Sequence, residues 1–201
     1  LKDAKWLLVD YGCGTGIATE KIIEHLGEEN ILSCRLWDYS QRAREFAQQR
    51  LNSKFPKVKV ELGDQSLPKA DNLLFCISHV LTELAEEKVI ELLSWVDKAK
   101  MVLWVEPGTS QVSQRLISVR ERLMKTMSIV APCTHSNSCG MLNINNQQHW
   151  CHFFAPPPAV VFQSRFWRNF SDEMKIDLRS LPTSYLVFIQ KALEAENPSL
   201  S

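Results

Sequence analysis

The 201-residue chain is 45% hydrophobic, with six tryptophans and nine phenylalanines, which is enough apolar material for one sizeable core and excludes a disordered or fibrous protein. Its 23 basic and 23 acidic residues balance, so the charge neither indicates nor excludes nucleic-acid binding. No stretch approaches the roughly 20 apolar residues that cross a bilayer. We therefore expect one domain over residues 1–201, and no membrane association.

Short apolar runs alternate with helical patterns through the first half of the chain. Five runs have the length and bounding residues of buried parallel strands. These predicted strands cover residues 6–10, 31–37, 58–62, 72–78 and 101–105. The helices predicted between them cover residues 17–26, 41–51 and 86–96. This alternation predicts an α/β fold with a Rossmann-like, doubly wound parallel sheet.

The second half is less regular. We expect a helix over 113–126 and strands over 128–131 and 184–190, with an irregular insertion over 132–183 before the last strand. The insertion holds three cysteines and an aromatic and basic run over 162–168. Four residues of that run are candidates for stacking on RNA bases or pairing with phosphates: Arg165, Phe166, Trp167 and Arg168. We favour instead an amphipathic helix that packs its aromatic side chains on the core.

A glycine-rich segment, residues 9–16, stands where the first strand meets the first helix. Gly12, Gly14 and Gly16 allow a tight turn and close approach of a ligand, and the helix N-terminus offers unpaired N–H groups. Asp38 ends the second strand, where a carboxylate can accept hydrogen bonds from ribose hydroxyls. The pattern predicts a nucleotide-cofactor site in preference to a purely structural turn.

The spacing G-x-G-x-G after Asp10 differs from the G-x-G-x-x-G of dinucleotide-binding proteins. It resembles the first motif of class I methyltransferases, which implies the fold of that class and S-adenosyl-L-methionine as cofactor. The resemblance places Asp38 at the ribose and Asp64, in a Gly-Asp turn after the third strand, at the adenine edge. It places four residues at the methionyl side of the cofactor: Asp10, Gly12, Gly14 and Gly16.

No catalytic motif is evident. Amino-group methyltransferases carry an Asp/Asn-Pro-Pro-aromatic segment after the fourth strand, but here residues 78–84 read Ser-His-Val-Leu-Thr-Glu-Leu. His79 is a candidate general base there, because an imidazole titrates near working pH. A lone histidine at a strand end is more often structural, so the catalytic group stays open.

Three thiols and three imidazoles gather in a polar, turn-rich stretch: Cys133, Cys139, Cys151, His135, His149 and His152. Thiolates select zinc or iron–sulfur centres, although paired C-x-x-C knuckles are missing. We favour metal binding over a loop of free cysteines or one disulfide. A catalytic Pro-Cys nucleophile, as in cytosine-5 RNA methyltransferases, is disfavoured because Cys133 follows the fifth strand and its helix instead of the fourth strand.

Four segments follow the glycine motif in order: Glu-Pro-Gly-Thr at 106–109, A-P-C-x-H-x-x-x-C at 131–139, W-C-H-F at 150–153 and Ser-Tyr-Leu at 184–186. Together they resemble the methyltransferase-like assembly factors of the mitochondrial ribosomal small subunit and their bacterial homologues. The resemblance covers nearly the whole chain. It implies S-adenosyl-L-methionine binding, a 4Fe-4S cluster and association with the small subunit or its rRNA, in the mitochondrial matrix of a eukaryote or the cytoplasm of a bacterium.

The same resemblance makes Cys133, Cys139 and Cys151 cluster ligands. The fourth cysteine of the family lies in a segment after the final strand that this sequence does not reach. Either that segment lies outside this sequence, or this homologue lacks the cluster, or the fourth ligand is His135, His149 or His152. Zinc is the alternative metal. Our leading hypothesis is an enzyme that methylates small-subunit rRNA. The second is a non-catalytic ribosome-assembly factor that keeps the cofactor fold, and the third is a small-molecule methyltransferase.

Overall fold

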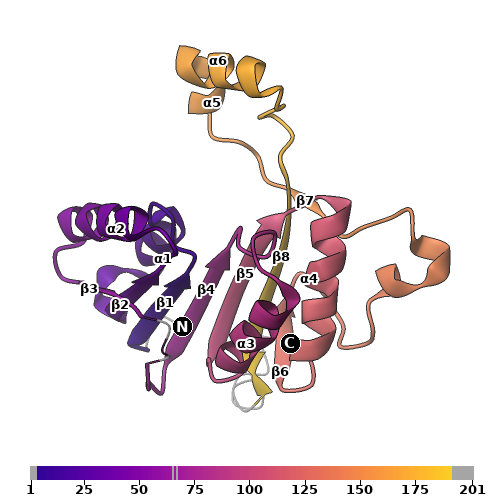
Figure 1. The fold of residues 1–201 in the computed structure, drawn as a ribbon, viewed down its shortest axis with the longest axis horizontal. Helices are drawn as coiled ribbons and strands as arrows, with labels where there is room; N and C mark the ends of the chain where they lie inside the picture. Colours follow the sequence, from indigo (N-terminus) through magenta and orange to yellow (C-terminus); the bar gives the residue numbers. More distant parts are fainter. Residues whose placement is uncertain (1–3, 65, 67, 192–201) are drawn as a thin grey trace.

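A computed structural model describes residues 4–64, 66 and 68–191, and within them an eight-stranded sheet forms the centre of the molecule (Figure 1). The strand order is β3-β2-β1-β4-β5-β8-β6, and β7 pairs with β8. The first five strands are parallel, whereas β8 runs antiparallel to both β5 and β6. The strands are β1 (Trp6–Tyr11), β2 (Ile31–Trp37), β3 (Lys59–Leu62), β4 (Leu73–Ser78), β5 (Met101–Pro107), β6 (Met127–Ala131), β7 (Phe153–Phe154) and β8 (Pro182–Gln190).

Helices cover both faces of this sheet. One core cluster joins the sheet to α1 and α2, and a second joins it to α3 and α4. The α-helices are α1 (Ile17–Leu26), α2 (Gln41–Lys54), α3 (Glu86–Val96), α4 (Ser110–Leu123), α5 (Val160–Gln163) and α6 (Arg165–Met174). Short 3₁₀ helices cover Glu28–Asn30, Gly140–Leu142 and Ile144–Asn146. The predicted doubly wound α/β fold is confirmed.

Two helices begin where hydroxyl side chains cap them. The Ser40 hydroxyl accepts a hydrogen bond from the Ala43 N–H, and the Thr109 hydroxyl accepts one from the Val112 N–H. Such caps satisfy backbone donors that a helix cannot pair internally. Because Thr109 is the cap, α4 begins three residues before the helix predicted from residue 113.

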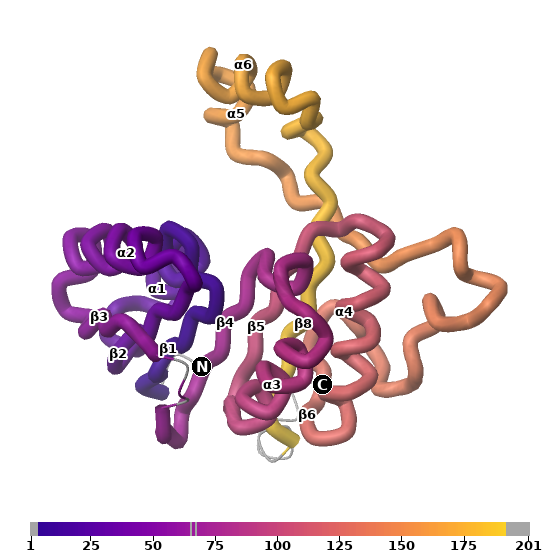
Figure 2. The backbone as a smooth tube through the Cα atoms, viewed as in Figure 1, coloured from indigo at the N-terminus to yellow at the C-terminus, as the bar shows by residue number. Residues whose placement is uncertain are grey.

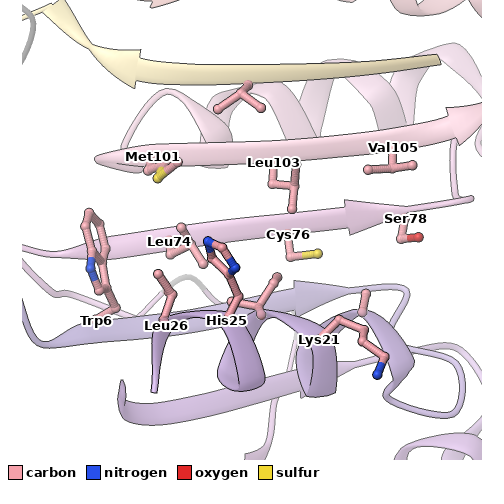
Figure 3. Close-up of a pocket in the computed structure, with 13 residues that line it drawn as sticks. Trp6, Lys21, His25, Leu26, Leu74, Cys76, Ser78, Met101, Leu103 and Val105 are labelled. Carbon is pink, nitrogen blue, oxygen red and sulfur yellow. The ribbon is translucent and has the colours of Figure 1, made fainter. Parts of the chain in front are cut away.

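The helical cover is thinner on the α1 side of β4, β5 and β8. An apolar groove of about 440 Å³ lies there, between α1 and the sheet (Figure 3). Met101, Leu103 and Val105 point into it from β5, and His25 points into it from α1. Alternate residues of β5 are buried on the opposite face, as the two-residue period of a strand requires.

The insertion before the last strand has more regular structure than predicted. Residues 132–152 form a loop beside α4, and α5 and α6 then stand away from the sheet on two connecting segments (Figures 1 and 2). The prediction that the aromatic run packs on the core is wrong. Phe166 is 66% exposed, and its ring contacts Trp167 and Phe170 of the same helix. We call residues 155–181, which carry α5 and α6, the arm.

No helix in the described ranges has the length and apolar character to cross a membrane.

Candidate functional site

The turn between β1 and α1 is bound to the end of β2. The N–H groups of Gly12 and Cys13 both donate to the Trp37 carbonyl, at 2.8 and 2.9 Å. The Gly14 N–H donates to Asp38 Oδ2 at 2.9 Å. These bonds hold the predicted methionyl-side turn and the predicted ribose carboxylate in one site at the carboxyl ends of two neighbouring parallel strands, where ligands bind in open α/β sheets.

The three glycines of the turn have left-handed backbones, with φ of 79° at Gly12, 50° at Gly14 and 79° at Gly16. L-residues rarely adopt such angles, so glycine is required for conformation. At Gly12 it is also required for space, because a Cβ there would lie 2.3 Å from Val80 Cγ2. A Cβ at Gly14 would meet no heavy atom within 4 Å, so that backbone faces open space.

Asp10 lies beneath the turn and is fully buried. Its Oδ2 accepts a hydrogen bond of 2.6 Å from the Thr19 hydroxyl, whereas Oδ1 has no protein partner. Burial raises the pKa of Asp10 from 3.8 to about 6, against the opposing effect of the Thr19 hydrogen bonds. A buried oxygen without a donor is unusual and indicates a group kept for a ligand or a water.

The two other predicted carboxylates differ in their contacts. Asp38 is half-buried, and its Oδ1 accepts a 2.9 Å hydrogen bond from the Ser40 N–H. Asp64 is exposed and forms a 2.6 Å ion pair with Arg35. Hydrogen bonds from Ser66 lower the pKa of Asp64 below its usual value. Asp38 is therefore bonded to the glycine turn, while the Asp64 carboxylate is engaged by its own neighbours.

The loop after β4 is held by a residue that the sequence did not single out as functional. Glu106 of β5 is fully buried, and its Oε1 accepts hydrogen bonds from the Val80 N–H, the Leu81 N–H and the Trp104 indole. Burial raises the pKa of Glu106 above its usual value, against the effect of these donors and of nearby His79. The sequence signals were a charged residue at the end of an apolar strand and its place in the Glu-Pro-Gly-Thr segment of the family resemblance.

His79 is exposed and has a left-handed backbone, with φ of 59°. Its N–H donates to the Val105 carbonyl at 2.9 Å. A positive φ is uncommon for a residue other than glycine and occurs often at functional turns. The position of the imidazole at the loop next to the glycine turn is compatible with the predicted role, which stays a prediction.

The three cysteines of the insertion converge. Cys133, Cys139 and Cys151 line one small cavity between α4 and β8. Burial raises the pKa of the Cys151 thiol, and the neighbouring Cys133 and Cys139 raise it further. The Cys151 carbonyl accepts hydrogen bonds from two hydroxyls, those of Ser113 and Ser184.

Arg120 of α4 organises this loop and was also missed from the sequence. It is 1% exposed, and its Nε lies 3.2 Å from Cys133 Sγ. Its Nη2 donates to the carbonyls of His135 and Asn137. A charged residue on the apolar stripe of a predicted helix was the available signal.

The candidate histidine ligands do not line this cavity. His135 and His149 are exposed, and the ring of His152 stacks on Trp150 with centroids 5.0 Å apart. Within the described part of the chain, no group of three or more His, Cys, Asp or Glu side chains is arranged to hold a metal ion. The structure thus brings the three thiols together without confirming a metal site.

A comparison with protein families bears on the whole chain. The family model described as mitochondrial small ribosomal subunit Rsm22 matches residues 5–178. The chain belongs to the Rsm22 family. The match spans the glycine turn, the cysteine loop and most of the arm, as the sequence resemblance predicted. No curated protein matches this chain by sequence.

Solved structures show the same fold. A Pyrococcus horikoshii protein provisionally named an RNA methyltransferase is 12% identical, with a TM-score of 0.54 over 92% of this chain and 74% of its own. The YcgJ protein from Bacillus subtilis is 14% identical, with a TM-score of 0.54 over 93% and 92% of the two chains. At these identities the likeness shows the fold alone: this member of the Rsm22 family has the fold of class I methyltransferases.

Proposed function

We propose that this Rsm22-family chain binds S-adenosyl-L-methionine at the β1–α1 turn and acts as a methyltransferase-like protein on or with small-subunit rRNA. One observation carries the donor site: the glycine turn is fastened to Asp38 and leaves open space over Gly14. The unpartnered, buried Oδ1 of Asp10 supports it, because a ligand or bound water would supply the missing donor.

In this proposal the residues of the turn contact different parts of the donor. Gly12, Gly14 and Gly16 admit the methionyl part close to the backbone, with Asp10 beneath them. Asp38 accepts hydrogen bonds from the ribose hydroxyls through the lone pairs that its two backbone donors leave unused. Asp64 contributes at the adenine edge. When bound, S-adenosyl-L-methionine supplies an electrophilic methyl group on a sulfonium centre.

The arm supports contact with RNA. Exposed aromatic rings beside arginines can stack on unpaired bases and pair with phosphates. Arg165, Phe166 and Arg168 are exposed on α6, and Trp167 is half-buried beside them. The arm stands away from the sheet, so these side chains reach a partner without displacing the core (Figure 1).

A second candidate function is a non-catalytic assembly factor of the small subunit. The loop after β4 favours this second candidate. Two N–H groups of the loop already donate to Glu106, and His79 is the one histidine among residues 79–84. The family description, mitochondrial small ribosomal subunit, suits either function. We propose the mitochondrial matrix as the site of action in a eukaryote and the cytoplasm in a bacterium.

We also propose that Cys133, Cys139 and Cys151 bind a 4Fe-4S cluster or zinc. Three thiols on one cavity supply part of such a ligand set, and the described residues place no fourth ligand beside them. The three thiols supply only part of the ligands that a cluster or a zinc ion needs, so no step of methyl transfer is assigned to this cysteine site. Metal and acid-labile sulfide analysis of anaerobically purified protein tests the proposal, and protein free of both would refute it.

Isothermal titration calorimetry with S-adenosyl-L-methionine tests the donor site. Asp38→Ala should weaken binding at least about tenfold, since it removes both the ribose acceptor and the bond that shapes the turn. Asp71→Ala is the control, because Asp71 is exposed and precedes the amino end of β4, whereas the proposed site lies at the carboxyl ends of the parallel strands. Equal affinity for both variants would contradict the assignment. Transfer of a labelled methyl group to small-subunit RNA then separates the enzyme from the assembly factor.

A further inference from the structure

Glu106 concentrates its hydrogen bonds on one oxygen. The indole N–H of Trp104 lies 2.8 Å from Oε1, and the N–H groups of Leu81 and Val80 lie 2.9 and 3.2 Å from it. Its Oε2 is buried and has no protein partner. Burial of a carboxylate with an unpartnered oxygen costs free energy, whereas an apolar side chain in the same place would need no hydrogen-bond partner. What Glu106 provides that an apolar side chain cannot is its hydrogen bonds to the loop.

The loop over residues 79–84 is fastened at two points by the β5–α4 unit. Glu106 binds two of its N–H groups, and Arg115 of α4 donates to the carbonyls of Leu81 and Leu84. The left-handed backbone of His79 stands at its start, and consecutive N–H groups after such a residue converge on an anion. The loop conformation therefore depends on the Glu106 carboxylate.

This loop meets the cofactor turn at Val80. The side chain of Val80 is buried and occupies the space that a Cβ on Gly12 would need. The position of Val80 thus limits where the Gly12 backbone can lie. A continuous path of contacts runs from Glu106 through the Val80 backbone and side chain to Gly12.

We propose that Glu106 is a positioning residue of the donor site, which sets donor affinity by holding the 79–84 loop against the β1–α1 turn. The inference rests on the proposed function, because it concerns the same site. In this proposal Glu106 acts through Val80 and not by contact with the donor. The loop also places His79 at the rim of the site, so the same anchor fixes the candidate base.

Three variants test the proposal by calorimetry with S-adenosyl-L-methionine. Glu106→Ala should weaken donor binding at least about tenfold. Glu106→Gln keeps one carbonyl oxygen for the same donors and should restore most of the affinity. Val102→Ala removes a fully buried side chain from the same strand and should lower stability while changing affinity less than about twofold. Equal losses in Glu106→Ala and Val102→Ala would overturn the proposal.

Hydrogen exchange measured by mass spectrometry gives a readout that needs no ligand. In Glu106→Ala, exchange should rise in the peptides covering 79–84 and 9–16, and it should stay unchanged over α2. A rise confined to 79–84 would overturn the inference, since the loop would then not restrain the turn. If the parent protein binds no donor, the proposed function fails, and the exchange at 9–16 still decides whether Glu106 restrains the turn.

Discussion

Asp10 combines complete burial, one unpartnered oxygen and a pKa raised from 3.8 to about 6. The folded chain therefore holds this proton more tightly than the unfolded chain does. Its contribution to stability is largest below pH 3.8 and is lost as the pH rises to about 6. At neutral pH the ionised carboxylate destabilises the fold, as expected of a group kept for ligand binding.

Asp10→Asn should remove this titration. Relative to the parent, its free energy of unfolding should rise by up to about 3 kcal/mol between about pH 4 and pH 7, because the amide stays neutral. Urea denaturation at a series of pH values measures the difference and cancels the other titrating groups. A difference that is constant across this range would contradict the assignment. Donor affinity at neutral pH should fall in the same variant.

Arg120 is the buried charged residue beside the cysteine loop, as Asp10 is beneath the glycine turn. Arg120→Ala should lower the free energy of unfolding by about 2–4 kcal/mol, since two loop carbonyls and Cys133 lose their donor inside the protein. Arg122→Ala on the same helix is the matched control. Arg122 is exposed and paired with Glu86, so its loss should change stability by no more than about 1 kcal/mol. Similar effects in chemical denaturation would refute the role of Arg120.

At the scale of elements, the sequence predicted the parallel half of the sheet closely. Apolar runs bounded by glycine or aspartate identified β1, β2 and β4, because a strand buried on both faces leaves a continuous signal. The same pattern located the glycine turn, whose role as a donor site stays a prediction. The roles of Glu106 and Arg120 could not be predicted, since most of their partners are backbone groups, or a thiol, that only the fold brings near.

For the arm, in contrast to the parallel strands, the sequence predicted the helix but not its packing. Its spacing predicted an amphipathic helix, and α6 forms, but periodicity does not reveal what an apolar face contacts. Here the aromatic rings of α6 contact one another, and Phe166 stays exposed, although we expected these rings to pack on the core. Tertiary placement, which the local pattern does not contain, decided the outcome.

The arm should be separable from the sheet. Phe154 of β7 and Pro182 of β8 are register partners, so a short Gly-Ser turn can join them in place of residues 155–181. This replacement should leave the thermal midpoint within a few degrees of the parent's, roughly the shift that 1 kcal/mol produces. Binding to small-subunit RNA, followed by gel shift, should be lost. Unchanged RNA affinity would contradict the role of the arm.

At the scale of the whole molecule, the sheet separates two sites. The donor turn belongs to β1, β2 and α1, whereas the cysteine cavity lies between α4 and β8, and β4 and β5 stand between them. The two sites share no side chain, so we expect substitutions in one to have little effect on the other. The molecule can therefore lose one site and keep the other.

Replacing Cys133, Cys139 and Cys151 together by serine should abolish metal content and leave donor affinity within about twofold of the parent's. Metal analysis and calorimetry on the same preparation measure both. A parallel loss of donor affinity would show that the two sites are coupled through the sheet, against the separation that the strand order indicates.

The place of β8 has a consequence for biosynthesis. Among the residues that the structure describes, the last strand lies between β5 and β6, and β6 pairs there with no strand but β8, which is made only with residues 182–190. At roughly 5–20 residues per second, a ribosome takes several seconds to make the intervening cysteine loop and arm. Throughout that time β5 presents an open apolar edge of the kind that promotes aggregation. The nascent chain thus passes through a vulnerable intermediate, which the arrival of β8 ends by completing both halves of the sheet at once.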